Sequence, residues 1–157
     1  MATTVKVKSY LDIQEEYKAA AALYPANLVE LTENSKVQSH SSSGANAEKA
    51  FALEDALQGN DLADEYSIDD VVRVWYPQRG DQVQAVLADG ETVKVGDFLE
   101  SAGDVSLQKH VVESEAVIYT EQVVGVALED VNTTGDSGVE SAPSAGSGKS
   151  YIKIRIV

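Results

Sequence analysis

Two short segments contain residue patterns that enzymes use to bind phosphate or to attack a carbonyl group. The run Gly146-Ser147-Gly148-Lys149-Ser150 ends like a phosphate-binding loop, and Gly135-Asp136-Ser137-Gly138 is similar to the nucleophile segment of serine proteases. The first pattern has Pro143 in place of its leading glycine, and a strand-like stretch follows it where a helix is needed. The second needs a histidine base oriented by a buried carboxylate. A flexible linker and a solvated turn explain these segments better.

The stretch 130–135 begins like a calcium-binding loop, because oxygen-bearing side chains stand at alternate positions before a glycine. The glutamate that closes such a loop is missing, since Ser141 occupies its position. An acidic turn is the favoured interpretation. Weak calcium binding by Asp130, Asp136 or Glu140 stays an alternative.

The chain has two histidines and no cysteine, so a common zinc site would need two carboxylates as further ligands. His40 and His110 lie at the ends of predicted strands, which favours a packing role over catalysis or metal binding. Because each pattern lacks a required position, we expect no enzymatic activity and no cofactor. Single replacement of Ser137, Lys149, His40 or His110 by alanine should accordingly leave the function of the protein largely intact.

The histidines belong to an internal repeat. Residues 27–30, Asn-Leu-Val-Glu, return as 97–100, Asp-Phe-Leu-Glu, and 36–40 return as 106–110, at a constant offset of 97 − 27 = 70. Ala-Leu-Glu-Asp at 52–55 recurs after 127 − 52 = 75 residues. The repeat predicts related β units over residues 24–56 and 94–131, each built on a hairpin with its own turn signals.

The remaining sequence favours an all-β fold. Short β-branched runs such as 71–76 and 82–87 alternate with turns, and 151–157 reads as a period-two strand. The stretch 46–57 has a helix-forming composition, but its repeat partner is rich in valine, so we predict a strand at about 50–55. The expected architecture is a β-barrel or sandwich with internal pseudo-twofold symmetry.

Residues 1–23 are expected to form an N-terminal arm outside the repeat. The segment starts like a lone strand, and residues 11–22 suggest one or two helical turns. Its few large apolar side chains are insufficient for a core but sufficient for binding a partner. We therefore expect the arm to bind a partner, and deletion of residues 2–20 to leave a folded body. The candidate partner-binding residues are Val5, Val7, Leu11, Ile13 and Tyr17.

The charge and hydropathy of the chain argue against several classes of binding partner. The chain has 157 residues, one domain's worth, and carries 12 basic and 26 acidic side chains, a net charge of −14. Such a charge repels nucleic acids and anionic membranes, and no apolar stretch approaches a membrane span of about 20 residues. The first residues lack the features of a signal peptide, so synthesis in a cytoplasm is expected.

Turn and strand signatures spread over residues 24–157 form a recognisable set. They are Tyr24 to Leu31, Phe51 to Gly59, Arg79-Gly80-Asp81, Leu87 to Gly90, and Val95 to Asp104. Together they resemble the head decoration (cement) proteins of tailed bacteriophages, which bind the outside of capsids built from HK97-like shell subunits. The segment before residue 24 is not covered by this resemblance.

The resemblance implies a β-barrel or β-tulip-like body over residues 24–157, assembled as a homotrimer. It also implies that the protein contacts the major capsid protein on the exterior of a virion after synthesis in a bacterial cytoplasm. No catalytic residue carries over, because the family has none. The alternative function is a particle-displayed carbohydrate- or receptor-binding β module, which should show exposed aromatic residues clustered on one face.

Overall fold

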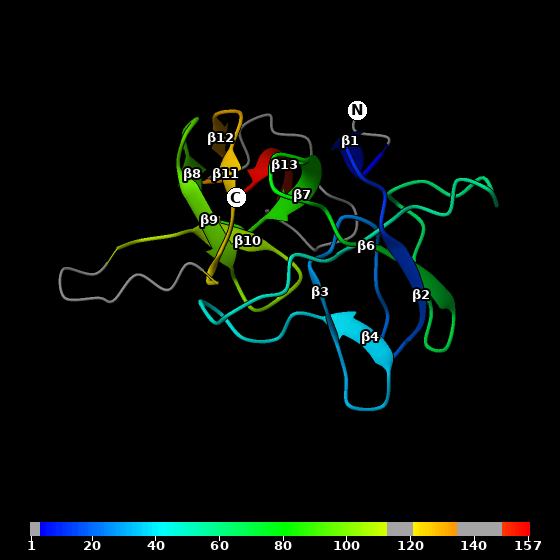
Figure 1. Cartoon of the computed structure of the whole chain (residues 1–157). Coiled ribbons are helices and arrows are strands. Elements are labelled where there is room, and N and C mark those ends of the chain that lie inside the picture. The colour runs from blue at the N-terminus through cyan, green and yellow to red at the C-terminus, as the bar shows by residue number, and fades with distance from the viewer. Residues whose placement is uncertain (1–3, 113–120, 135–148) are drawn as a thin grey trace.

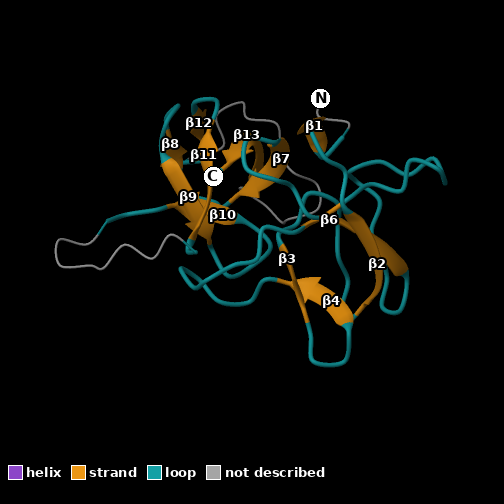
Figure 2. Cartoon of the chain, viewed as in Figure 1, coloured by secondary structure: helices purple, strands orange, loops and turns teal. Residues whose placement is uncertain are grey.

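The computed structural model describes residues 4–112, 121–134 and 149–157, and all regular elements in these ranges are β-strands (Figure 1 and Figure 2). The all-β prediction is therefore confirmed. The glycine- and serine-rich segments at 135–138 and 146–148 lie outside the described residues. The strands are β1 (Lys6–Lys8), β2 (Gln14–Ala19), β3 (Val29–Leu31), β4 (Lys36–Ser39), β5 (Phe51–Ala52), β6 (Val71–Trp75), β7 (Gln82–Leu87), β8 (Thr92–Val93), β9 (Phe98–Ser101), β10 (Leu107–Lys109), β11 (Val123–Ala127), β12 (Val131–Asn132) and β13 (Ser150–Ile156).

Five strands of the second half form a closed β-barrel. Their order is β7-β10-β9-β11-β13, and β13 pairs back onto β7 along its length. β1 lies beside β7, while β8 and β12 form a separate two-stranded sheet. Closure leaves no long open edge for aggregation. The interior is filled by fully buried aliphatic side chains, including Leu87, Leu99, Leu107, Ile152 and Ile154.

Five strands of the first half follow the order β3-β4-β2-β6-β5. An isolated bridge between Leu28 and Phe51 links the two ends of this sheet. A second core cluster lies inside it and includes Leu23, Val37 and Val74. The strand predicted at about 50–55 is present as the short β5.

The sequence repeat has the same strand register in both halves. Glu30 pairs with Gln38 in the β3–β4 hairpin, and Glu100 pairs with Gln108 in the β9–β10 hairpin. In each hairpin the glutamine Nε2 donates to the glutamate Oε1 at 2.9 Å. The offset, 100 − 30 = 70, is that of the sequence match. The duplicated hairpin is therefore a structural repeat.

The repeat begins earlier in each half than residues 24 and 94. β2 runs parallel to β4 with Ala19 opposite Val37, and β7 runs parallel to β10 with Leu87 opposite Leu107. β2 is thus the first-half equivalent of β7, at an offset of 87 − 19 = 68.

The repeat also ends later in each half than residues 56 and 131. The Leu53 N–H donates to the Arg73 carbonyl at 2.8 Å, and the Leu128 N–H donates to the Lys153 carbonyl at 2.9 Å. These bonds make β6 equivalent to β13. Each half therefore contains the same five strands, and the chain consists of two related barrel units, one after the other.

The expected arm over residues 1–23 is corrected by the position of β2. This strand lies between β4 and β6 in the first unit, so residues 14–19 belong to the body. Ala19 and Leu23 are fully buried. The helical turn expected within residues 11–22 is wrong, because two neighbouring strands supply backbone hydrogen bonds that outweigh local helix propensity. Deletion of residues 2–20 would remove a central strand.

The two units meet at a contact that we call the seam. In the first unit the seam consists of segment 40–47 together with Leu28, and in the second unit it consists of the β9–β10 turn. The Leu28 N–H donates to the Val105 carbonyl at 3.2 Å, and the Gly44 N–H donates to the Ser101 carbonyl at 2.8 Å. The Nδ1 of the buried His40 lies 2.7 Å from the Ser101 hydroxyl. Gly103 has a φ of +82°, and a Cβ built on it would lie 2.6 Å from the Ser43 nitrogen.

A Gly103→Ala substitution is expected to destabilise the protein more than Gly59→Ala. Gly59 has a nearly identical φ of +81° but nothing within 4 Å of a built Cβ. Each alanine pays the positive-φ strain of about 1 kcal/mol, and only the Gly103 variant also forces the seam apart. Urea unfolding measures the two free energies. An equal loss of unfolding free energy in the two variants would contradict close packing at the seam.

Equivalent turns precede the hairpins. The Asn27 Oδ1 accepts from the Tyr24 N–H at 3.0 Å, and the Asp97 Oδ2 accepts from the Lys94 N–H at 2.9 Å. The Asp97 carboxylate also contacts Lys109 Nζ at 2.8 Å. The Lys109 hydrogen bond, together with that from Lys94, holds the pKa of Asp97 below its usual value of 3.8.

Asp97→Asn should keep the turn and remove its pH dependence, because asparagine already fills this role at Asn27. The lowered pKa means that ionised Asp97 stabilises the folded state above the unfolded-state pKa near 3.8, and that this contribution disappears as pH falls through the folded-state value. Unfolding free energies measured between neutral pH and pH 3 should therefore fall less steeply for the variant. An unchanged slope would show that Asp97 makes no such contribution.

Candidate partner-binding surfaces

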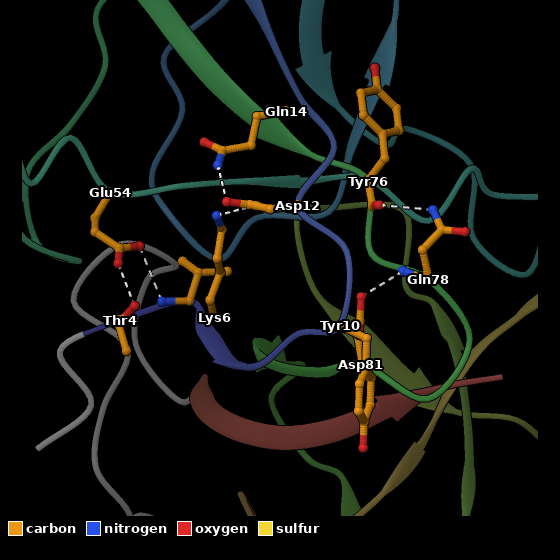
Figure 3. A network of polar contacts seen from close by, with 10 residues as sticks. Thr4, Lys6, Tyr10, Asp12, Gln14, Glu54, Tyr76, Gln78 and Asp81 are labelled. Carbon is orange, nitrogen blue, oxygen red and sulfur yellow. Dashed lines mark hydrogen bonds and ion pairs between the residues drawn. The ribbon is translucent and has the colours of Figure 1, made fainter.

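The N-terminal segment 4–13 is held against the body of the protein. The Val5 N–H donates to Glu54 Oε2 at 3.1 Å, and the Val5 carbonyl accepts from the Gln84 N–H at 2.8 Å. Thr4 also bonds to Glu54 (Figure 3). The segment is therefore anchored to both units, to Glu54 of the first and to β7 of the second.

Polar contacts fix the rest of this segment. The Tyr10 N–H donates to Oδ1 of the fully buried Asp81 at 2.9 Å (Figure 3). Lys6 Nζ pairs with Asp12 and lies 5.6 Å from the centre of the Trp75 ring. The hydrogen bond from Lys6 lowers the pKa of Asp12. These contacts hold the apolar side chains between them in fixed positions.

The five predicted partner-binding residues occupy different environments. Val5 is fully buried in the core of the barrel unit, so it is not available to a partner. Tyr17 lies on β2, where it packs against the core of the first unit and accepts a hydrogen bond from the Tyr76 hydroxyl at 3.4 Å. Val7, Leu11 and Ile13 remain at the surface, with exposures of 37%, 58% and 46%.

Val7, Tyr10, Leu11 and Ile13 form what we call the N-terminal strip. The sequence reasoning missed Tyr10, which is 69% exposed and whose ring lies 5.3 Å from Lys8 Nζ. Four exposed apolar side chains within seven residues of an anchored segment make a candidate contact surface. Lys8 adds a positive charge to it.

A second candidate surface is a pocket of about 660 Å³, which we call the β9 pocket. Its lining combines apolar side chains with basic groups and one carboxylate. Sequence reasoning missed it, because its residues come from distant segments. The lining residues are Lys49, Arg79, Phe98, His110, Val112, Glu121, Val123 and Val157.

The β9 pocket contains no arrangement for nucleophilic catalysis among its described residues. His110 Nδ1 lies 2.5 Å from Glu100 Oε2, so this ring nitrogen already has a partner. The equivalent histidine, His40, uses its two ring nitrogens at the seam, toward Ser101 and toward the Asn46 carbonyl at 3.2 Å. Within the described ranges, no three His, Asp or Glu side chains are placed to hold a metal ion.

The described part of the candidate calcium loop is occupied by internal contacts. Asp130 Oδ1 accepts from the Val95 N–H at 2.8 Å, and its Oδ2 contacts Lys94 Nζ at 3.2 Å. Asp136, Glu140 and Ser141 lie outside the described residues. Lys149, at the end of the phosphate-loop-like segment, contacts Asp104 Oδ2 at 2.7 Å.

Exposed aromatic residues do not gather on one element. Trp75 is fully buried in the core, so it does not line a sugar site. In the described part of the chain, Tyr10 and Phe98 are the aromatic side chains that are more than half exposed. They belong to the N-terminal strip and to the β9 pocket, respectively.

Val5→Ala and Val7→Ala should separate core from surface in the N-terminal segment. Val5 is fully buried, so its truncation is expected to lower the free energy of unfolding by about 2 kcal/mol. Val7 is 37% exposed, and its truncation should cost less than about 0.5 kcal/mol. Thermal or urea unfolding measures both. Equal small effects would mean that the segment is not docked in solution.

Comparison with known proteins identifies a fold relative. No family model matches the chain, and no curated protein matches its sequence. No helix of the described residues is long and apolar enough to cross a membrane. Among solved structures, the base of the head fibre protein gp8.5 (its N-terminal part) from bacteriophage phi29 is similar, with a TM-score of 0.54 and 12% sequence identity over 94% of this chain and 95% of that one. The chain therefore shares the fold of a phage head fibre base.

Proposed function

We propose that this protein is a structural component of a phage virion that attaches to the head. The observation that carries the proposal is the shared fold, which extends over nearly the full length of both this chain and the phi29 head fibre base. The sequence signatures that resemble head decoration proteins point independently to the same location. A purely structural role also agrees with the internal contacts of His40, His110 and Lys149, the described residues of the candidate catalytic motifs.

The specific role that we propose is binding to the outer surface of an HK97-like capsid, where the protein contacts the major capsid protein and cements neighbouring capsomers. A homotrimer suits this role, because several weak contacts made together hold more strongly than any one of them. The net charge of −14 supports the solubility of the free subunit before it attaches.

The N-terminal strip is the proposed shell contact. Its four apolar side chains are exposed, and the anchored backbone keeps them in place before binding. Preorganisation reduces the entropy that binding costs. The strip replaces the flexible arm as the contact surface, and Val7, Leu11 and Ile13 retain the role expected from the sequence.

Co-sedimentation with heads that lack this protein tests the proposal. The purified chain is expected to sediment with such heads. Leu11→Ser together with Ile13→Ser should weaken binding by at least about tenfold, because both apolar contacts are lost. Ile68→Ser is the matched control. Ile68 is 63% exposed, and the next residue, Asp69, bonds through its N–H to the Ala19 carbonyl, at the end of β2 that is remote from the strip.

Two results would contradict the proposal in different ways. If the unmodified chain fails to sediment with heads, the head-binding function is wrong. If it binds and the double variant binds equally well, the shell contact lies elsewhere. Cryo-electron microscopy of decorated heads would then locate the bound density at or away from the junctions between capsomers.

A further inference from the structure

The seam is a contact between a face of the first unit and a turn of the second unit. On the first unit, the face contains Leu28 and His40, which are 1% and 3% exposed. On the second unit, the β9–β10 turn supplies Ser101 and Val105 to this face. Because the two units are structural repeats, the second unit also has an equivalent of this face, and the first unit also has an equivalent of this turn.

The equivalent face on the second unit is the β9 pocket. Adding the hairpin offset of 70 to Leu28, His40 and Ser42 gives Phe98, His110 and Val112, all of which line the pocket. Adding 75, the offset of the later part of the repeat, to Asn46 gives Glu121, which also lines the pocket. The first-unit face is covered, whereas Phe98 is 51% exposed. Among the described residues, the pocket is thus the counterpart of the seam face and is exposed at Phe98. Its edge lies beside the first unit, because Lys49 lines it and the Glu121 carbonyl accepts from the Ala47 N–H at 3.2 Å.

The equivalent turn on the first unit is the β3–β4 turn, residues 31–36. Subtracting 70 from Ser101 and Val105 gives Leu31 and Ser35. Ser35 has a φ of +56° and Val105 a φ of +79°, so the backbone adopts the left-handed region at both positions. Leu31 is 45% exposed. Its residues Glu33, Asn34 and Ser35 are exposed, so this turn is the solvent-facing counterpart of the turn that fills the seam.

We propose that the β3–β4 turn of one copy of this protein seats in the β9 pocket of a second copy, repeating between chains the contact made within each chain. The chemistry of the two surfaces is complementary. Leu31 would replace the polar Ser101 and so face His110, the counterpart of His40, in a lining that also includes the apolar Phe98 and Val112. Glu33 brings a carboxylate to a pocket in which two cations, Lys49 and Arg79, outnumber one carboxylate, Glu121.

The contact between copies differs from the seam at one position. Glu33 stands where the second unit has Gly103, and a Cβ at Gly103 would collide with Ser43. The volume of about 660 Å³ in the β9 pocket provides room for the larger side chain.

This arrangement joins two different surfaces, so it is a head-to-tail contact that closes into a ring when the rotation between copies permits. It goes beyond the proposed function, because it concerns the free protein and does not require a phage head. It also supplies the subunit contact that the proposed homotrimer needs.

Cysteine cross-linking tests the pairing directly, because the chain contains no cysteine of its own. At the seam, the backbones of Leu28 and Val105 are joined by a hydrogen bond. Their counterparts Phe98 and Ser35 should therefore come within the Cα separation that a disulfide spans, roughly 4.4–6.8 Å. A mixture of Ser35→Cys protein and Phe98→Cys protein is expected to form a covalent dimer on mild oxidation, whereas neither variant alone should do so.

The control mixture pairs Ser35→Cys with Leu57→Cys. Leu57 is 86% exposed, against 51% for Phe98, and does not line the pocket, so its thiol is at least as accessible as the test thiol. The proposal is overturned if the test mixture cross-links no more than this control. Dimers of Phe98→Cys protein alone would also overturn it, because they indicate a contact between identical surfaces.

Sedimentation velocity provides a second measurement without cysteines. Glu33→Lys should shift the oligomer toward monomer relative to the unmodified chain, since it replaces the carboxylate that meets Lys49 and Arg79 with a further positive charge. A monomeric unmodified chain, or an oligomer unaffected by this substitution, would contradict the proposal. Because no heads are present, failure here leaves the co-sedimentation result to decide the head-binding function separately.

Discussion

The seam between the two units determines how the rest of the structure is arranged. His40 and Ser101 are both almost fully buried there and satisfy each other at 2.7 Å. Removal of either partner would leave a buried polar group unpaired, which typically costs about 1–3 kcal/mol. Backbone bonds from Leu28 and Gly44 on either side fix the orientation further. The seam therefore sets which surfaces of each unit are covered and which stay open.

Sequence reasoning found the hairpin repeat because its side chains perform the same task twice. Glu30 with Gln38 and Glu100 with Gln108 form the same cross-strand hydrogen bond, so residue types were retained together with spacing. The flanking strands pair through their backbones, which do not restrict side-chain type. β2 is largely surface-facing and polar, whereas its equivalent β7 is almost entirely buried and apolar. The repeat was therefore not recognisable there, and the strand was mistaken for part of an arm.

The candidate surfaces were predicted to a smaller extent. Alternation of Val5 and Val7 correctly indicated a strand, but alternation alone does not reveal which face meets the protein's own core. Val5 is buried because β1 pairs with β7, a contact between residues far apart in the sequence. The β9 pocket was missed for a related reason. Its lining runs from Lys49 to Val157, and only the folded chain brings those segments together.

When two like units are joined face to turn, one equivalent face and one equivalent turn are not used by that joint. Repeat proteins generally make such terminal surfaces polar, which keeps them soluble as monomers. Here the equivalent face exposes Phe98 and Val112, and the equivalent turn exposes Leu31. The covered face and its turn are joined instead through His40 and Ser101, a polar pair. Exposed apolar side chains thus stand on the face and the turn that the chain's own repeat leaves over, which is where a further copy would continue the repeat.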